Sequence, residues 1–215
     1  SLLKEVDGLS RLPTVARPHL PKEEVEGQSY YFITKPEFRN LIRDKAFIEW
    51  NQIYGNLYGT KKNLVQRFIT EAAEKGHDLL LEIDVDGKRN FARQYPDVVS
   101  IFVLPPSMEE LERRITTRKA ESPEQITKRL TRAMKELARK NEYHYCVVND
   151  SRRAAVEQVK AIIATAEPKG DSPRPPPGSP RRLIVRADSR AATGDTSIPF
   201  GSAPTTGSHT WHQRN

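Results

Sequence analysis

The first 167 residues alternate between two hydrophobic periods, one typical of buried strands and one typical of amphipathic helices. Short apolar runs predict strands at 30–34 (YYFIT), 77–84 (HDLLLEID), 98–106 (VVSIFVLPP) and 145–150 (YCVVND). Several of these runs are continuous rather than alternating and end in acids or prolines. That pattern is typical of parallel strands that are buried on both faces.

Helix-period segments lie between and after these runs, at 34–44, 60–76, 87–96, 107–119, 122–143 and 151–167. Two of them begin with capping-box signals, Thr34 with Glu37 and Ser122 with Gln125, each with a proline in the first turn. Gly76 is placed to end the second. Strands that alternate with helices of this length predict an α/β domain with a largely parallel sheet.

The composition changes at Pro168. The stretch 168–215 holds eight of the 16 prolines, is rich in Ser, Thr and Gly, and shows no sustained periodicity. We therefore predict a folded domain at 1–167 and a disordered tail at 168–215. The run RRLIVRAD (181–188) leaves a short strand or a docking peptide open as an alternative.

The overall composition excludes some classes of protein and leaves others open. The chain has 215 residues, one cysteine (Cys146) and no apolar run long enough to span a membrane. We therefore expect a protein of a reducing compartment, the cytoplasm, with no membrane partner. The net charge is +7, and the tail carries seven cations against three anions. The modest charge left on the domain suits phosphorylated small molecules as well as nucleic acid, and no folded nucleic-acid motif accompanies the basic tail.

Two carboxylates are candidates for ligand binding. Glu49 lies within the apolar stretch FIEW, and Asp84 follows the buried run LLLEI. A solvent-facing strand position and a solvated turn are the alternatives. Because ligands bind at the carboxyl ends of parallel strands, the two acids are predicted to face a ligand that presents N–H donors. Guanine is such a ligand, since N1–H and the 2-amino group form a row of donors, whereas adenine presents an acceptor at N1.

The helical region from Met108 to Tyr143 is rich in arginine. The arginines that cluster around the turn TTRKAESPEQ are Arg113, Arg114, Arg118, Arg129 and Arg132, and two of them on either side of a helix-turn-helix can close over a polyphosphate. A solvated helix face is the alternative for each arginine. Tyr30 and Tyr58 can offer hydroxyls to a phosphate, although packed tyrosines are the simpler interpretation.

Several motifs in one order resemble the guanylate kinase family: EVEGQSYYF, FIEWNQIYGNLYGT, LEIDVDG, IFVLPPSMEELERRI, the step from Arg118 to Arg129, and VVND. The resemblance covers about 1–167. It implies a P-loop-kinase-like parallel sheet flanked by helices, a small mixed β subdomain that binds GMP, and a helical lid. It also implies phosphoryl transfer from ATP, with Mg²⁺, to GMP.

The resemblance also implies roles for individual residues. Glu49 and Asp84 would hold guanine; the GMP phosphate would be held by Arg17, Tyr30 and Tyr58, with Thr60 as the small hydroxyl residue of the site. Arg118 and Arg129 would be lid arginines on the transferring phosphoryl group. Asn149 of VVND would contact the ATP cofactor.

The sequence departs from the family pattern at several positions. Lys22, or nothing, replaces a second phosphate arginine, Pro13 stands where a base-contacting serine is expected, and Glu82 replaces the first acid of Asp-x-Asp. No G-x-x-x-x-G-K-[ST] occurs, and SLLKEV resembles the segment directly after that loop in the family. We therefore expect a chain that begins after the phosphate-binding loop, lacks the strand before it, and is essentially inactive. A catalytically silent protein-interaction module is the alternative function.

Overall fold

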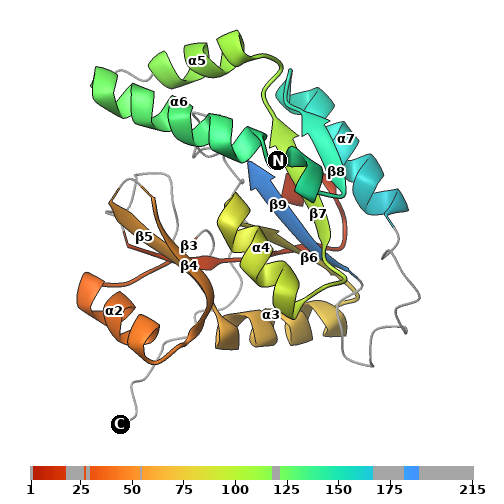
Figure 1. Cartoon of the computed structure of the whole chain (residues 1–215). Coiled ribbons are helices and arrows are strands. Elements are labelled where there is room, and N and C mark those ends of the chain that lie inside the picture. The colour runs from red at the N-terminus through yellow and green to blue at the C-terminus, as the bar shows by residue number, and fades with distance from the viewer. Residues whose placement is uncertain are drawn as a thin grey trace.

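The computed structural model describes residues 2–17, 27, 30–53, 55–117, 122–166 and 182–188, which form two β-sheets with flanking helices (Figure 1). The larger sheet has the strand order β1-β6-β9-β7-β8, and all of its strands are parallel. Its strands are β1 (Leu9–Leu12), β6 (Asp78–Glu82), β7 (Val99–Leu104), β8 (Tyr145–Val148) and β9 (Leu183–Asp188). The prediction of an α/β domain with a parallel sheet is confirmed.

The middle strand of this sheet corrects the prediction for the C-terminal segment. Residues 183–188 fall in the segment predicted to be disordered, and the structure instead shows the alternative, a short strand: β9 pairs with β6 on one side and with β7 on the other. Ile184, Val185 and Ala187 are fully buried there. The proline-rich composition around this run led to the prediction of disorder, although the run itself is a strand that is apolar on both faces. Residues 168–181 and 189–215 lie outside the described residues.

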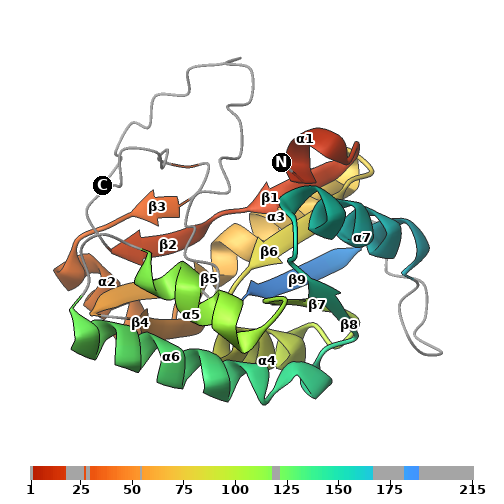
Figure 2. The ribbon, with the colours of Figure 1, turned by 90° about the horizontal axis from the view of Figure 1, so that it is seen from above.

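Helices cover both faces of the larger sheet (Figure 2). One face carries α1 (Leu2–Glu5) and α7 (Arg152–Thr165), and the other carries α3 (Lys62–Glu74) and α4 (Val85–Gln94). Val159 and Ile163 of α7 share a core with Leu80 and Ile184. The opposite core joins Phe91 of α4 to its neighbours on β6 and β9. None of the helices in the described part of the chain is both long and apolar enough to cross a bilayer.

The smaller sheet is mixed, as predicted for the GMP-binding subdomain. Its order is β3-β2-β5-β4, with β2 parallel to β3 and antiparallel to β5. Its strands are β2 (Thr14–Arg17), β3 (Tyr30–Phe32), β4 (Phe47–Ile53) and β5 (Asn56–Lys61), and α2 (Lys35–Arg43) packs beside it. Phe38 of α2 stacks on Phe47 of β4 with ring centroids 4.6 Å apart.

The predicted helical lid is a pair of helices, α5 (Met108–Thr116) and α6 (Pro123–Leu137), which lie across the top of the view in Figure 1. Ser122 and Gln125 form the predicted capping box at the start of α6, as Thr34 and Glu37 do in α2. α6 ends at Leu137 rather than continuing to Tyr143. The chain turns there through a short 3₁₀ helix (Lys140–Glu142), which brings the Tyr143 ring to 4.9 Å from that of Phe102.

Candidate active site

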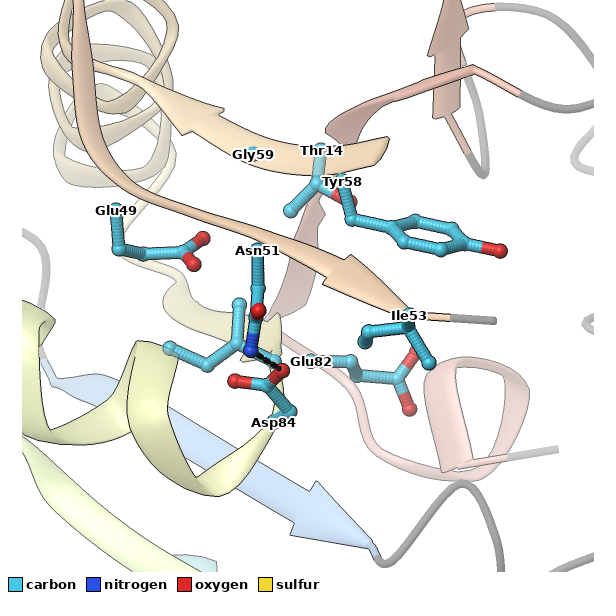
Figure 3. A pocket seen from close by; sticks show the side chains of 9 residues that line it. Thr14, Glu49, Asn51, Ile53, Tyr58, Gly59, Glu82 and Asp84 are labelled. Atoms are coloured by element: carbon cyan, nitrogen blue, oxygen red, sulfur yellow. Dashed lines mark hydrogen bonds between the residues drawn. The ribbon is translucent and has the colours of Figure 1, made fainter. Parts of the chain in front are cut away.

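A pocket lies where the smaller sheet meets the carboxyl edge of the larger one (Figure 3). β4 and β5 form one wall, and the end of β6 with the start of α4 forms the other. The lining residues are Thr14, Glu49, Asn51, Ile53, Tyr58, Gly59, Glu82, Ile83 and Asp84. The structure therefore brings together the two acids that the sequence predicted to share a site.

Glu49 is buried at this wall because β4 is irregular. The pairing of β4 with β5 shifts register between Phe47 and Glu49, so that Phe47, Ile48 and Glu49 are all buried in succession. The Thr60 hydroxyl, itself fully buried, donates a hydrogen bond to Glu49 Oε1. This explains an acid in an apolar stretch, since the bulge turns it inward.

The carboxylate of Glu49 also lies against the first turn of α4. A Cβ at Gly87 would stand only 2.8 Å from Glu49 Oε2, so only glycine leaves room for this approach. The N-terminal turn of a helix carries a partial positive charge that stabilises a nearby carboxylate. Gly87 thus lets the helix support a negative charge in the pocket.

Asp84 is the N-cap residue of α4 and is held from three directions. Its Oδ1 accepts a hydrogen bond from the Gly87 N–H (2.7 Å). Its Oδ2 accepts one from Asn51 Nδ2 (2.7 Å, dashed in Figure 3) and one from Arg132 Nη2 (3.1 Å). A carboxylate offers about four lone-pair positions, so one acceptor position remains for a ligand.

Glu82, the third acid of the pocket, has a different setting. It forms ion pairs with Arg11 of β1 (2.9 Å) and with Arg186 of β9. All three side chains are largely buried, with 12–14% of each exposed. The charge of Glu82 is therefore balanced within the protein.

Tyr30 and Tyr58 were predicted at the phosphate end of the site. Tyr58 lines the pocket, and its ring centroid lies 6.0 Å from that of buried Tyr30. Arg17 ends β2, but its side chain is not among those described. Arg118 and Lys22 lie outside the described residues.

Arg129, the other arginine predicted for the lid, lies on α6 three residues before Arg132. Residues three apart share a helix face, and Arg132 reaches Asp84, so Arg129 lies on the side of α6 that meets the pocket. The hydrogen bond from Arg132 to Asp84 links α6 to the pocket. Arg132 also donates to Glu136 (2.7 Å) on the next turn.

Asn149 follows β8 at the same edge of the larger sheet as Asp84, which follows β6. Its carbonyl accepts a hydrogen bond from Arg114 Nη2 (3.0 Å), while Arg114 Nε donates to Glu110 (2.7 Å). Hydrogen bonds from Arg113 and Arg114 lower the pKa of Glu110 to about 2. This network fixes α5 to the end of β8.

Lys88 belongs to the only Gly-Lys pair in the chain, yet it does not resemble a phosphate-binding lysine. Its Nζ donates to the carbonyl of Glu142 (2.5 Å) and lies 4.7 Å from the centre of the Tyr143 ring. Burial lowers the pKa of Lys88, and the charge of Glu142 opposes that shift. Lys88 thus joins α4 to the segment after α6.

Three residues of the site were not predicted: Thr14, Asn51 and Arg132. A serine was expected at the position of Pro13, and Thr14, the next residue, supplies a hydroxyl instead. An alignment to the family pattern shifted by one residue would therefore have predicted Thr14. Asn51 lies two residues after Glu49 on the same strand, where the side-chain period of two places it on the same face. No sequence signal distinguished Arg132 from its neighbouring arginines.

Comparison with known proteins identifies the family. The family model described as guanylate kinase matches residues 2–166. The chain belongs to the guanylate kinase family. It is 43% identical to the guanylate kinase of Symbiobacterium thermophilum over 164 residues, covering 76% of this chain and 75% of that protein. It is 44% identical to the guanylate kinase of Caldanaerobacter subterraneus subsp. tengcongensis over 140 residues, covering 65% of this chain and 66% of that protein.

The fold agrees with the family. The crystal structure of guanylate kinase from Anaplasma phagocytophilum matches with a TM-score of 0.62 and 30% identity, covering 79% of this chain and 80% of that chain. Guanylate kinases are ATP:GMP phosphotransferases, so the chain is a member of a family of nucleotide kinases. The similar proteins are named as enzymes, which does not favour the interaction-module alternative.

Proposed function

We propose that the pocket binds GMP as the phosphoryl acceptor and that Glu49 and Asp84 recognise the guanine base. The observation that carries the proposal is the convergence on one pocket of two buried carboxylates, 7% and 6% exposed, one from β4 of the smaller sheet and one from the N-cap of α4. Glu49 accepts hydrogen bonds from N1–H and the 2-amino group, and the remaining acceptor position of Asp84 adds to them. Thr14 and Asn51 supply neutral polar contacts beside the base.

The phosphate of GMP lies toward Tyr58 and Tyr30 in this proposal, with Arg17 as its cation. Their hydroxyls can donate to phosphate oxygens, and both rings belong to the smaller sheet that also carries Glu49. Thr60 acts through Glu49, because its hydroxyl is directed at that carboxylate. Thr60 is therefore a positioning residue and does not contact the phosphate.

ATP is proposed to bind on the other side of β9, near the end of β8, with Asn149 beside it. The strand order supports this arrangement, because Asp84 follows β6 and Asn149 follows β8 at the same edge of the sheet, with β9 and β7 between them. Arg129 and Arg118 of the helical lid would neutralise charge on the transferring phosphoryl group.

Mg²⁺ would accompany the ATP phosphates rather than occupy a protein cage. The acids at this edge already have protein partners: Glu82 binds two arginines, Asp84 three donors and Asp86 the guanidinium of Arg139. They do not fit a magnesium site of their own, so no step is derived through the ion. We also propose the cytoplasm as the compartment, in keeping with the single cysteine.

Binding and turnover test the proposal separately. Calorimetric titration of the full chain with GMP is expected to give binding, which Arg129→Ala leaves nearly unchanged. A coupled assay of ADP release is expected to show very slow turnover, since the 215 residues hold no G-x-x-x-x-G-K-[ST] to cradle the ATP phosphates. Failure to bind GMP would contradict the proposal, and rapid turnover would reveal another phosphate cradle.

A further inference from the structure

The middle strand of the larger sheet lies outside the part of the chain that matches the family. The family match ends at residue 166, whereas β9 comprises residues 183–188. β9 is hydrogen-bonded to both neighbouring strands. The carbonyl of Arg182, the residue just before β9, accepts a further hydrogen bond from the N–H of Leu79 in β6 (2.9 Å). Without it, β6 and β7 would each present an open edge in the middle of the sheet.

The side chains of β9 complete the cores on both faces of the sheet. Ile184 belongs to the cluster beneath α1 and α7, and Val185 to the cluster beneath α3 and α4. Ala187 packs with Phe102 and Tyr143 near the end of the lid helices. A strand that contributes to three separate clusters is an integral part of the folded unit.

Charges at both ends of β9 match those of β6 in register. Arg182 lies near Asp78 (4.0 Å), and Arg186, paired in register with Glu82, forms an ion pair with it. The acids of β6 and the arginines of β9 are each four residues apart, so one alignment satisfies both pairs. Any other register would leave a largely buried charge opposite an apolar residue, which is costly.

The second of these pairs reaches the candidate active site. Glu82 lines the pocket, and Arg186 and Arg11 hold its carboxylate from two sides. With Arg186 absent, Glu82 would keep only Arg11, so the positive charge beside Glu49 and Asp84 would fall by one and the Glu82 carboxylate would be held from one side only.

We propose that residues 182–188 are the segment by which this chain supplies its own central strand, and that Arg186 thereby positions Glu82 at the nucleotide pocket. The binding partner of the slot between β6 and β7 is this named C-terminal segment, recognised by two apolar faces and two charge pairs. The folded unit is then the described part of 2–166 together with 182–188. Only the role of Arg186 at the pocket rests on the proposed function.

The test keeps the full chain and cuts it in place. A recognition sequence for a site-specific protease is inserted between Asp171 and Ser172, and the folded protein is cleaved and passed through gel filtration without nucleotide. The C-terminal fragment, identified by mass, is expected to co-elute with the larger fragment and to separate only in denaturant. Separation in native buffer would overturn the proposal.

Matched substitutions in the same cleavable chain sharpen this result. Val185→Asp places a charge at a fully buried position of β9, and Val148→Asp makes the same change at a position of β8 that is 41% exposed. The fragment is expected to be lost from the Val185→Asp protein, or that protein to unfold, while the Val148→Asp protein retains it. Equal retention in both would contradict burial of β9.

The link to the pocket is measured by titration of the intact chain with GMP. Arg186→Gln is expected to weaken binding several-fold, and Arg186→Lys to restore most of it because the charge returns. Equal affinities in these two variants and the parent would contradict the positioning role. Fragment retention is measured without GMP, so absence of GMP binding by the parent chain would count against the proposed function and leave the test of the strand intact.

Discussion

The two walls of the pocket use buried carboxylates in different ways. On the larger sheet, Glu82 is held between the guanidinium groups of Arg11 and Arg186. On the smaller sheet, Glu49 accepts from the neutral hydroxyl of Thr60 and lies against the start of α4. The first arrangement balances charge between strands and holds the sheet together. The second presents an acceptor to a ligand, so the two acids should differ in what their loss costs.

The largest expected effect is on stability, from Glu82→Gln. Removing one partner of a buried ion pair leaves charge uncompensated, here on Arg11 and Arg186, and costs about 3–5 kcal/mol in the free energy of unfolding. Urea denaturation measures it, with Glu74→Gln on the exposed end of α3 as the control. A change as small as that of the control would show that Glu82 does not hold the sheet.

The converse result is expected for Glu49→Gln. The Thr60 hydroxyl can still donate to the amide oxygen, so stability should change little. Charge-assisted hydrogen bonds contribute about 1.5–3 kcal/mol, so affinity for GMP should fall about tenfold or more. Calorimetric titration with GMP measures the affinity, with Glu112→Gln on the exposed face of α5 as the control. A destabilised protein with unchanged affinity would reverse the roles assigned to the two walls.

A smaller effect is expected from Gly87→Ala. The added methyl group would lie 2.8 Å from Glu49 Oε2 and 3.1 Å from Asp84 Oδ1, so the Glu49 carboxylate must move away from the helix. Affinity for GMP should fall several-fold while thermal stability changes modestly. Arg89→Ala, on the same helix, controls for the change in α4. Parent-like GMP binding by Gly87→Ala would argue against the contact with the helix.

The smallest effect concerns Glu110, an acid on the lid. Its folded-state pKa, about 2, lies below the ordinary value of 4.5 because Arg113 and Arg114 donate to it. Its contribution to stability is therefore present above about pH 4.5 and is lost as the pH falls toward 2. Comparing Glu110→Gln with the parent across this range measures it. High salt should reduce the difference, since exposed pairs are screened.

Much of the fold could be predicted from the sequence because the signals that mark its helices and strands are local. Capping boxes at Thr34 and Ser122 and a left-handed Gly76 (φ 65°) mark helix ends in the structure as expected. Glu49 and Asp84 were predicted to share a pocket because the order of the motifs and the ends of the strands can also be identified in the sequence. The roles of both acids at guanine stay predictions.

The features that could not be predicted depend on contacts between distant segments. β9 is separated from β6 by about one hundred residues, and only its pairing with two strands shows that residues 183–188 are part of the sheet. The hydrogen bond from Arg132 to Asp84 joins positions 48 residues apart and required the path of α6 across the pocket. The bulge in β4 likewise depends on its pairing with β5.

The most direct test of the account is a calorimetric titration of the full chain with GMP, IMP and AMP under one set of conditions. If Glu49 reads the donor edge of guanine, GMP should bind tightest, IMP should be weaker because it lacks the 2-amino group, and AMP weakest because it presents an acceptor at N1. Glu49→Gln should reduce the difference between GMP and IMP. Equal affinity for all three nucleotides, or a preference for AMP, would contradict the assignment of this pocket to guanine.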